Sequence, residues 1–124
     1  MTIINTSHAP APIGPYSQAV LAGNTLYVSG QVALDGAGIF HNQSLETEAH
    51  QVMHNLKAIL EAGNMNFECV TKCSIFLQDF NDFARVNEIY GQYFTSHKPA
   101  RETVQVSRLP KDARLEISCI AVKE

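Results

Sequence analysis

The sequence of 124 residues predicts a single α+β domain in which a mixed β-sheet carries two helices on one face. Two stretches place apolar residues at helical spacing, whereas several short runs alternate apolar and polar residues, as strands do. Hydrophobic residues make up 45% of the chain and charged residues 17%, which is typical of a globular domain with its own core. We therefore expect one domain over residues 1–124 with no linker.

The N-terminal half predicts a β-hairpin followed by a long helix. Residues Gly14–Ala22 and Thr25–Gln31 are expected to form two short strands, because the intervening Gly23-Asn24 pair favours a turn. The pattern also allows an extra strand at the N-terminus. A helix is expected from about Ser44 to Ala62, with Ser44 as its N-cap and Gly63 as its end. Its apolar residues recur at spacings of three and four: Ala49, Val52, Met53, Leu56, Ile59 and Leu60.

The C-terminal half predicts a strand, a second helix and two more strands, so the element order is β-β-α-β-α-β-β. Residues Cys69–Leu77 are rich in side chains that favour strands. A helix should begin near Asn81 and end before Lys98-Pro99, since proline disfavours a helical conformation in the residue before it. Strands are then expected over Arg101–Ser107 and Arg114–Val122. The second helix is indicated by one stripe of apolar residues: Phe83, Val86, Tyr90, Tyr93 and Phe94.

Two charged residues in the last two strands suggest a binding site. In Arg101–Ser107 the valines and Arg101 occupy alternate positions, so Arg101 should point away from the core. In Arg114–Val122, Glu116 alternates in the same way with an apolar row. If both apolar rows pack against the same layer, Arg101 and Glu116 share the opposite face of the sheet. The arginine fork binds carboxylates in a bidentate manner, so a small carboxylic acid is a reasonable ligand.

The sheet face without helices is expected to be polar. Its predicted side chains are Tyr27, Ser29, Arg101, Thr103, Gln105 and Glu116. Because two helices cover only one face of a sheet, the second face has to meet either water or another subunit. Both possibilities are compatible with the sequence.

Charge and cysteine content argue against several classes of protein. The formal net charge is −3 with only nine Lys and Arg residues, which makes nucleic acid a poor candidate partner. The N-terminal segment does not resemble a secretory signal and no run reaches membrane-spanning length, so we expect a cytoplasmic protein without a membrane partner. The three cysteines fit a reducing compartment. Cys69 and Cys73, roughly 13 Å apart along a strand, are too distant for a disulfide.

No metal site is expected. His50 and His54 have the i, i+4 spacing that presents two imidazoles to zinc, but Gln51 replaces the glutamate of a metalloprotease motif and a third ligand is not evident. We therefore expect both histidines at the solvent edge of the first helix. Tyr90, Tyr93 and Phe94 are expected in the core rather than in a base-stacking surface, because of their helical spacing.

Four segments together resemble one protein family, the reactive intermediate deaminases, RidA or YjgF. They are Gly14–Ala19 (GPYSQA), Val28–Gln31 (VSGQ), Asp82–Phe94 (DFARVNEIYGQYF) and Pro99–Ile117 (PARETVQVSRLPKDARLEI). The similarity extends over essentially the whole chain. It implies a fold like chorismate mutase of the AroH type, with a mixed six-stranded sheet and two helices on one face. It also implies a homotrimer in which the sheets form a central barrel and the active sites lie between subunits.

The same resemblance implies an activity. Members of this family are 2-iminobutanoate/2-iminopropanoate deaminases, which hydrolyse reactive 2-imino acids and their enamine tautomers to 2-oxo acids and ammonia. Neither a cofactor nor a metal is implied. The implied small-molecule partners are 2-imino and 2-oxo acids.

Carried over to matching positions, the resemblance assigns the substrate carboxylate to Arg101 and the attacking water to Glu116, with Tyr16 as a third catalytic residue at the cleft. Substrate-binding roles are implied for a further set: Ser29, Gly30, Thr103 and Asn87. Many members have a cysteine where this chain has Thr103. A cysteine nucleophile is therefore absent at that position, and direct attack by water is implied.

Three other functions are compatible with these residues. A non-catalytic module that binds small carboxylates needs the same cleft without turnover. An RNA-directed translation inhibitor or endoribonuclease is an activity also attributed to relatives, although the charge of the chain argues against it. A chorismate mutase is suggested by fold alone, which is a weak reason for assigning a function.

Overall fold

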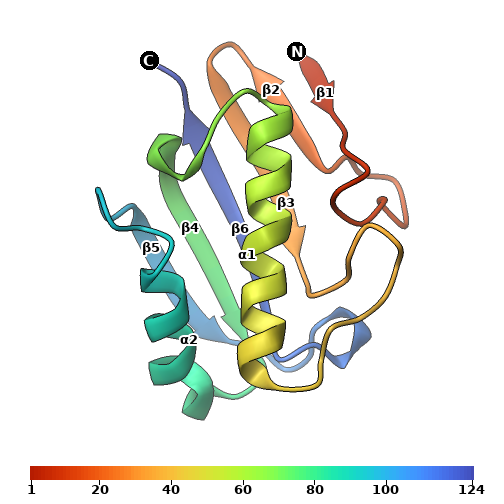
Figure 1. The fold of residues 1–124 in the computed structure, drawn as a ribbon, viewed down its shortest axis with the longest axis vertical. Helices are drawn as coiled ribbons and strands as arrows, with labels where there is room; N and C mark the ends of the chain where they lie inside the picture. The colour runs from red at the N-terminus through yellow and green to blue at the C-terminus, as the bar shows by residue number, and fades with distance from the viewer.

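The protein, described over all residues 1–124 by a computed structural model, is a six-stranded mixed sheet with both α-helices on one face (Figure 1). The predicted α+β fold is confirmed. The strand order is β1-β2-β3-β6-β4-β5, and every neighbouring pair is antiparallel except β4 and β5, which are parallel. The elements are β1 (Thr2–Ile4), β2 (Ala19–Ala22), β3 (Thr25–Gln31), α1 (Leu45–Ala62), β4 (Val70–Leu77), α2 (Phe83–Gly91), β5 (Ala100–Gln105) and β6 (Leu115–Val122).

Helix α1 begins and ends where the sequence predicts. The Ser44 side chain accepts a hydrogen bond from the Thr47 backbone N–H, and Gly63 follows the last helical residue. The apolar side of α1 is fully buried against the sheet. Neither helix combines the length and apolar character that crossing a bilayer requires.

Several predicted elements are shorter than expected, α2 and the first predicted strand most of all. Helix α2 ends at Gly91, yet Phe94 beyond it is still only 6% exposed, so the apolar stripe continues past the helix as buried chain. The predicted first strand is regular only from Ala19 onward. Gln18 explains this difference, because its buried side chain bonds to Thr6 N–H and to the carbonyl oxygens of Thr6 and Pro10, which ties the preceding segment to the N-terminal loop.

Arg101 and Glu116 lie on opposite faces of the sheet, so the prediction that they share one face within a single chain is wrong. Arg101 on β5 pairs with Cys73 on β4, and Cys73 is completely buried on the helix-covered side. Glu116 on β6 pairs with Phe76, three residues further along β4 and therefore on the other side. The two apolar rows have opposite phases: that of β6 faces the helices, whereas Val104 of β5 faces away from them.

The face of the sheet without helices, here called the helix-free face, is more apolar than predicted. Thr103 and Gln105, which were predicted on the helix-free face, instead lie on the helix-covered side with Arg101. Bulky apolar side chains occupy it instead, and Val104 is 42% exposed and Tyr27 51% exposed. By strand register these side chains are Ile3, Val20, Tyr27, Phe76, Val104, Ile120 and Val122. The register places Ser74, Glu102 and Ser118 between Phe76 and Val104 and the other five apolar side chains, so the face carries two apolar groups separated by polar residues. The larger group, which includes Ile3, Val20, Tyr27 and Ile120, is a candidate interaction surface.

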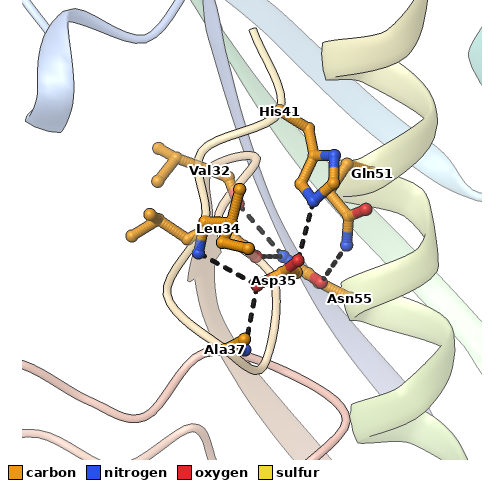
Figure 2. Close-up of polar contacts among 8 residues, drawn as sticks. Val32, Leu34, Asp35, Ala37, His41, Gln51 and Asn55 are labelled. Carbon is orange, nitrogen blue, oxygen red and sulfur yellow. Dashed lines mark hydrogen bonds and ion pairs between the residues drawn. The ribbon is translucent and has the colours of Figure 1, made fainter.

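The loop that leaves β3 is held to α1 by a buried amide (Figure 2). Asn55, with no exposed surface, donates hydrogen bonds to the carbonyl oxygens of Val32 and Leu34, at 3.1 and 2.6 Å. Gln51, one turn earlier on α1, donates to the Asn55 side-chain oxygen at 2.9 Å. These bonds satisfy buried backbone groups and fix the end of β3 against the helix.

The same loop is closed upon itself by Asp35 (Figure 2). One carboxylate oxygen accepts hydrogen bonds from the backbone N–H groups of Ala37 and Ile39, and the other lies 2.8 Å from His41 Nε2. The hydrogen bonds from His41 and Ile39 lower the pKa of the Asp35 carboxyl. The segment after β3 is thus a shaped loop rather than a free linker.

A buried carboxylate fixes the start of β6. Glu48 on α1 is only 1% exposed, and it accepts hydrogen bonds from the Arg114 backbone N–H at 2.7 Å and from the Arg114 guanidinium at 3.0 Å. Arg114 stands two residues before Glu116. The contact therefore positions the strand that carries the acidic candidate of the site.

We expect Glu48→Ala to lower the free energy of unfolding by about 2–4 kcal/mol, because it leaves a partly buried amide and a guanidinium without their acceptor. Urea denaturation of the variant and the wild type measures the difference. The matched control is Glu46→Ala in the same helical turn, whose exposed ion pair with Arg85 is worth less than about 1 kcal/mol. Equal losses for the two variants would contradict a special role for the buried contact.

Candidate functional site

Arg101 forms the centre of one candidate site, at the start of the edge strand β5. Its guanidinium carbon lies 5.1 Å from the centre of the Tyr90 ring and 5.8 Å from that of Phe83. Arg101 Nη1 donates a hydrogen bond to Asn87 Oδ1 at 2.6 Å, so the structure brings together two of the predicted residues. No carboxylate forms an ion pair with this guanidinium. Its remaining donors are therefore free for an external anion.

A cavity of about 500 Å³ opens beside this arginine. It contains two cationic side chains and no acidic one, with aromatic and proline groups as its apolar wall. The lining residues are Asn87, Tyr90, Gly91, Phe94, Lys98, Pro99 and Arg101. A small organic acid fits this combination, since its carboxylate meets the guanidinium and its carbon chain meets the apolar wall.

Thr103 lies on the same side of β5 as Arg101, two residues further along. Its hydroxyl oxygen is buried and has no hydrogen-bond partner. A buried hydroxyl without a partner is uncommon in folded proteins. Thr103 is therefore an unsatisfied polar group close to the guanidinium.

Glu116 forms the centre of a second group, on the helix-free face. The register between β3 and β6 shifts between Val28 and Gln31, which places Gly30 beneath the carboxyl group. A Cβ atom at Gly30 would lie 2.6 Å from Glu116 Oε2, so no larger residue fits without displacing the carboxyl. The Glu116 side chain has no hydrogen-bond or ion-pair partner, and its burial raises the pKa of the carboxyl. A half-buried carboxyl without a partner is suited to accept and return a proton.

Ser29 lies beside this second group, and its hydrogen bonds are internal. Its hydroxyl donates to the Ser17 carbonyl oxygen at 2.6 Å, and its N–H donates to the Gln18 carbonyl oxygen at 2.9 Å. Tyr16, just before these residues, is 52% exposed, and its hydroxyl accepts a hydrogen bond from the Ile13 N–H at 3.3 Å. Ser29 therefore ties the Tyr16 segment to β3, next to Gly30.

The predicted site residues thus fall into two groups. The first group, on the helix-covered side, is Asn87, Arg101 and Thr103. The second group is Tyr16, Ser29, Gly30 and Glu116, and of these Gly30 and Glu116 are in direct contact. Within one chain the sheet separates the two groups.

Sequence reasoning missed the role of Tyr90. The apolar stripe predicts it as a core residue, and it is 7% exposed, but one face of its ring also supports the Arg101 guanidinium. Burial, with Cys73 beside the ring, raises the pKa of the phenol, which therefore stays neutral. Asn87 and Tyr90 are three residues apart and lie on one side of α2, and this spacing was the available signal.

Two other predictions about single residues have definite outcomes. Of the two histidines predicted at the solvent edge of the first helix, His54 is exposed, whereas His50 is half-buried and its Nδ1 lies 2.6 Å from the Tyr93 hydroxyl. All three cysteines are free thiols. Cys73 and Cys119 are direct neighbours on β4 and β6. From the sequence, only the distance between Cys69 and Cys73 along one strand was considered, so this cross-strand neighbour was not predicted.

Known proteins resemble this chain over nearly its whole length. Residues 6–123 match the family described as Endoribonuclease L-PSP. A RutC family protein of Pyrococcus horikoshii is 49% identical over 98% of both chains. The human 2-iminobutanoate/2-iminopropanoate deaminase is 46% identical over 98% of this chain and 89% of its own length. Among solved structures, Escherichia coli TdcF with bound serine is 39% identical over 100% of both chains, with a TM-score of 0.96.

Proposed function

Because this chain belongs to the Endoribonuclease L-PSP family, which includes the RutC and YjgF proteins, we propose that it is a 2-imino acid deaminase. The reaction adds water to 2-iminopropanoate or 2-iminobutanoate and yields the 2-oxo acid and ammonia. The single observation that carries the proposal is the unpaired Arg101 guanidinium in a cavity without acidic side chains. The name of the human relative, which acts on these two imines, supports the substrate class.

In the proposed mechanism, Arg101 binds the carboxylate with two parallel hydrogen bonds, which fixes C2 of the imine. Glu116 takes a proton from a water molecule whose oxygen attacks C2. The electron pair of the C=N bond moves to nitrogen, which takes a proton from solvent. Glu116 then returns its proton to nitrogen, the C–N bond breaks and ammonia leaves. The hydroxyl proton passes to solvent as the carbonyl forms, so that water is consumed and no other reactant is needed.

We further propose that the active site forms between subunits of a homotrimer. Arg101 and Glu116 lie on opposite faces of one sheet, so a site that uses both has to take them from two copies of the chain. The apolar helix-free face supports the same proposal, since it provides a surface for a second copy to cover.

Mixing two inactive variants tests the shared site. Arg101→Ala supplies an intact Glu116, and Glu116→Gln supplies an intact Arg101, so refolding the two together is expected to restore about one quarter of the wild-type activity in random trimers. Light scattering measures the assembly, and distinct affinity tags measure the mixing. If mixed trimers form but recover no activity, a site that takes Arg101 from one subunit and Glu116 from another is excluded.

The deaminase assay tests the function itself. An amino-acid oxidase generates 2-iminopropanoate, and semicarbazide traps the imine that remains. We expect the wild-type protein to shorten the lifetime of the imine and reduce the trapped product. An unchanged imine lifetime, together with stabilisation by pyruvate, would instead identify a non-catalytic carboxylate-binding module. An endoribonuclease is tested separately by cleavage of single-stranded RNA at low salt, where binding to phosphates is strongest.

Gly30→Ala is expected to lower kcat by about tenfold to a hundredfold while the protein remains folded, because the new methyl group displaces only the flexible end of Glu116. Steady-state kinetics and thermal unfolding measure the two effects. The control is Gly30→Ala in the Glu116→Gln background, where it should lower kcat little further than Glu116→Gln alone does. An undiminished effect in that background would show that Gly30 acts independently of the carboxyl.

A further inference from the structure

Lys98 is a cation of the Arg101 cavity for which the proposed reaction has no use. It lies in the connection between α2 and β5, three residues before Arg101, and both side chains line the same cavity. Lys98 is exposed and forms no ion pair. By contrast, Lys72 on β4 pairs with Glu102 at 3.1 Å. Lys98 is thus an unpaired ammonium at a place where a ligand is expected.

The charge of this cavity differs from that of the whole chain. The protein carries a formal net charge of −3, yet the seven residues that line the cavity include Lys98 and Arg101 and no Asp or Glu. Pro99, which lies between the two cations along the chain, also lines the cavity as part of its apolar wall. Two unpaired cations that share a cavity favour a ligand with two negative charges.

A 2-imino monoacid carries only one carboxylate, and Arg101 takes it. We infer, on the basis of the proposed function, that Lys98 binds a second carboxylate, so that this deaminase also serves 2-imino dicarboxylic acids of four or five carbons. The carbon chain between the two carboxylates lies along the apolar wall formed by Phe94 and Pro99. Because the lysine side chain has four flexible methylene groups, its ammonium can reach the second carboxylate of either a four-carbon or a five-carbon diacid.

The kinetic test compares 2-iminoglutarate and 2-iminosuccinate with 2-iminopropanoate, each generated by the corresponding amino-acid oxidase. Lys98→Gln keeps most of the side-chain length and removes the charge. We expect it to lower kcat/KM for one or both diacids by about tenfold and to leave 2-iminopropanoate within about twofold. Lys57→Gln is the matched control, because it removes the same charge from an exposed position on α1 that does not line this cavity. An equal effect of Lys98→Gln on monoacid and diacids overturns the inference.

A binding measurement separates failure of this inference from failure of the proposed function. By calorimetry, 2-oxoglutarate or oxaloacetate should bind the wild type more tightly than pyruvate does, and Lys98→Gln should abolish the difference. This result upholds the diacid site even if no imine is hydrolysed. If 2-iminopropanoate is hydrolysed but the diacids neither react nor bind better than pyruvate, the deaminase stands and the diacid site is rejected. Tight diacid binding that Lys98→Gln leaves unchanged also rejects the role of Lys98.

Discussion

Replacing Arg101 by alanine is expected to lower kcat/KM for 2-iminopropanoate by about a hundredfold to a thousandfold, which corresponds to about 3–4 kcal/mol. The guanidinium is the proposed partner of the substrate carboxylate, and Asn87 and the Tyr90 ring hold it in place. Its removal leaves the carboxylate in a cavity with an apolar wall and no bidentate donor. Initial rates with enzymatically generated imine measure the loss.

Two further variants define what Arg101 contributes. Arg101→Lys keeps the charge but not the planar fork, so it should recover only part of the activity. Arg108→Ala is the matched control, because Arg108 is exposed and pairs only with Asp112 in a turn. Thermal unfolding should show Arg101→Ala folded, since the lost contacts with one amide and two aromatic rings are worth about 1–2 kcal/mol. Full activity of folded Arg101→Ala would contradict the proposed carboxylate site.

Glu116→Gln is expected to lower kcat by about a hundredfold to ten-thousandfold, because the amide cannot take a proton from water. The variant should still bind pyruvate, since its Arg101 is intact. It should also be more stable than the wild type at neutral pH. Burial of the Glu116 carboxyl raises its pKa, so the folded protein loses stability as rising pH ionises this group.

The pH dependence of kcat/KM distinguishes a base from a merely structural carboxyl. A base acts when ionised, so activity should fall at acid pH through an apparent pKa above the ordinary value of a glutamate, about 4.3. The residual activity of Glu116→Gln should lack this acid limb. A wild-type limb that persists unchanged in Glu116→Gln, or a normal kcat for that variant, would remove Glu116 from the mechanism.

The elements that the sequence predicts best are those in which local signals agree. Helix α1 has an N-cap at Ser44, a regular apolar side and a glycine after its end, and its bounds match the prediction. The hairpin strand before Gly23 was overextended, because the alternation of residues does not show that the Gln18 side chain bonds to a distant loop. Long-range hydrogen bonds of this kind leave no local periodicity.

The candidate site was predicted less well, for a reason that lies in the phase of β5. The alternation of residues shows that the side chains of Val104 and Arg101 point to opposite faces of the sheet, but it does not show which of them faces the helices. The usual assumption that apolar residues face the chain's own core fails for an edge strand whose valine lies on an exposed apolar face. The parallel register with β4 decides the phase, and the sequence of β5 contains no information about that register.

Thr103 gives this site a chemical property that follows from its neighbours. A 2-imino acid is an electrophile, and a thiolate is the protein nucleophile most prone to react with one. The threonine hydroxyl is a poor nucleophile at this position, and the nearest thiol by strand register, Cys73, is completely buried. Burial also raises the pKa values of Cys73 and Cys119, which keeps both as thiols. If the proposed deaminase function is correct, the cavity therefore exposes no reactive thiol that an electrophilic imine could modify.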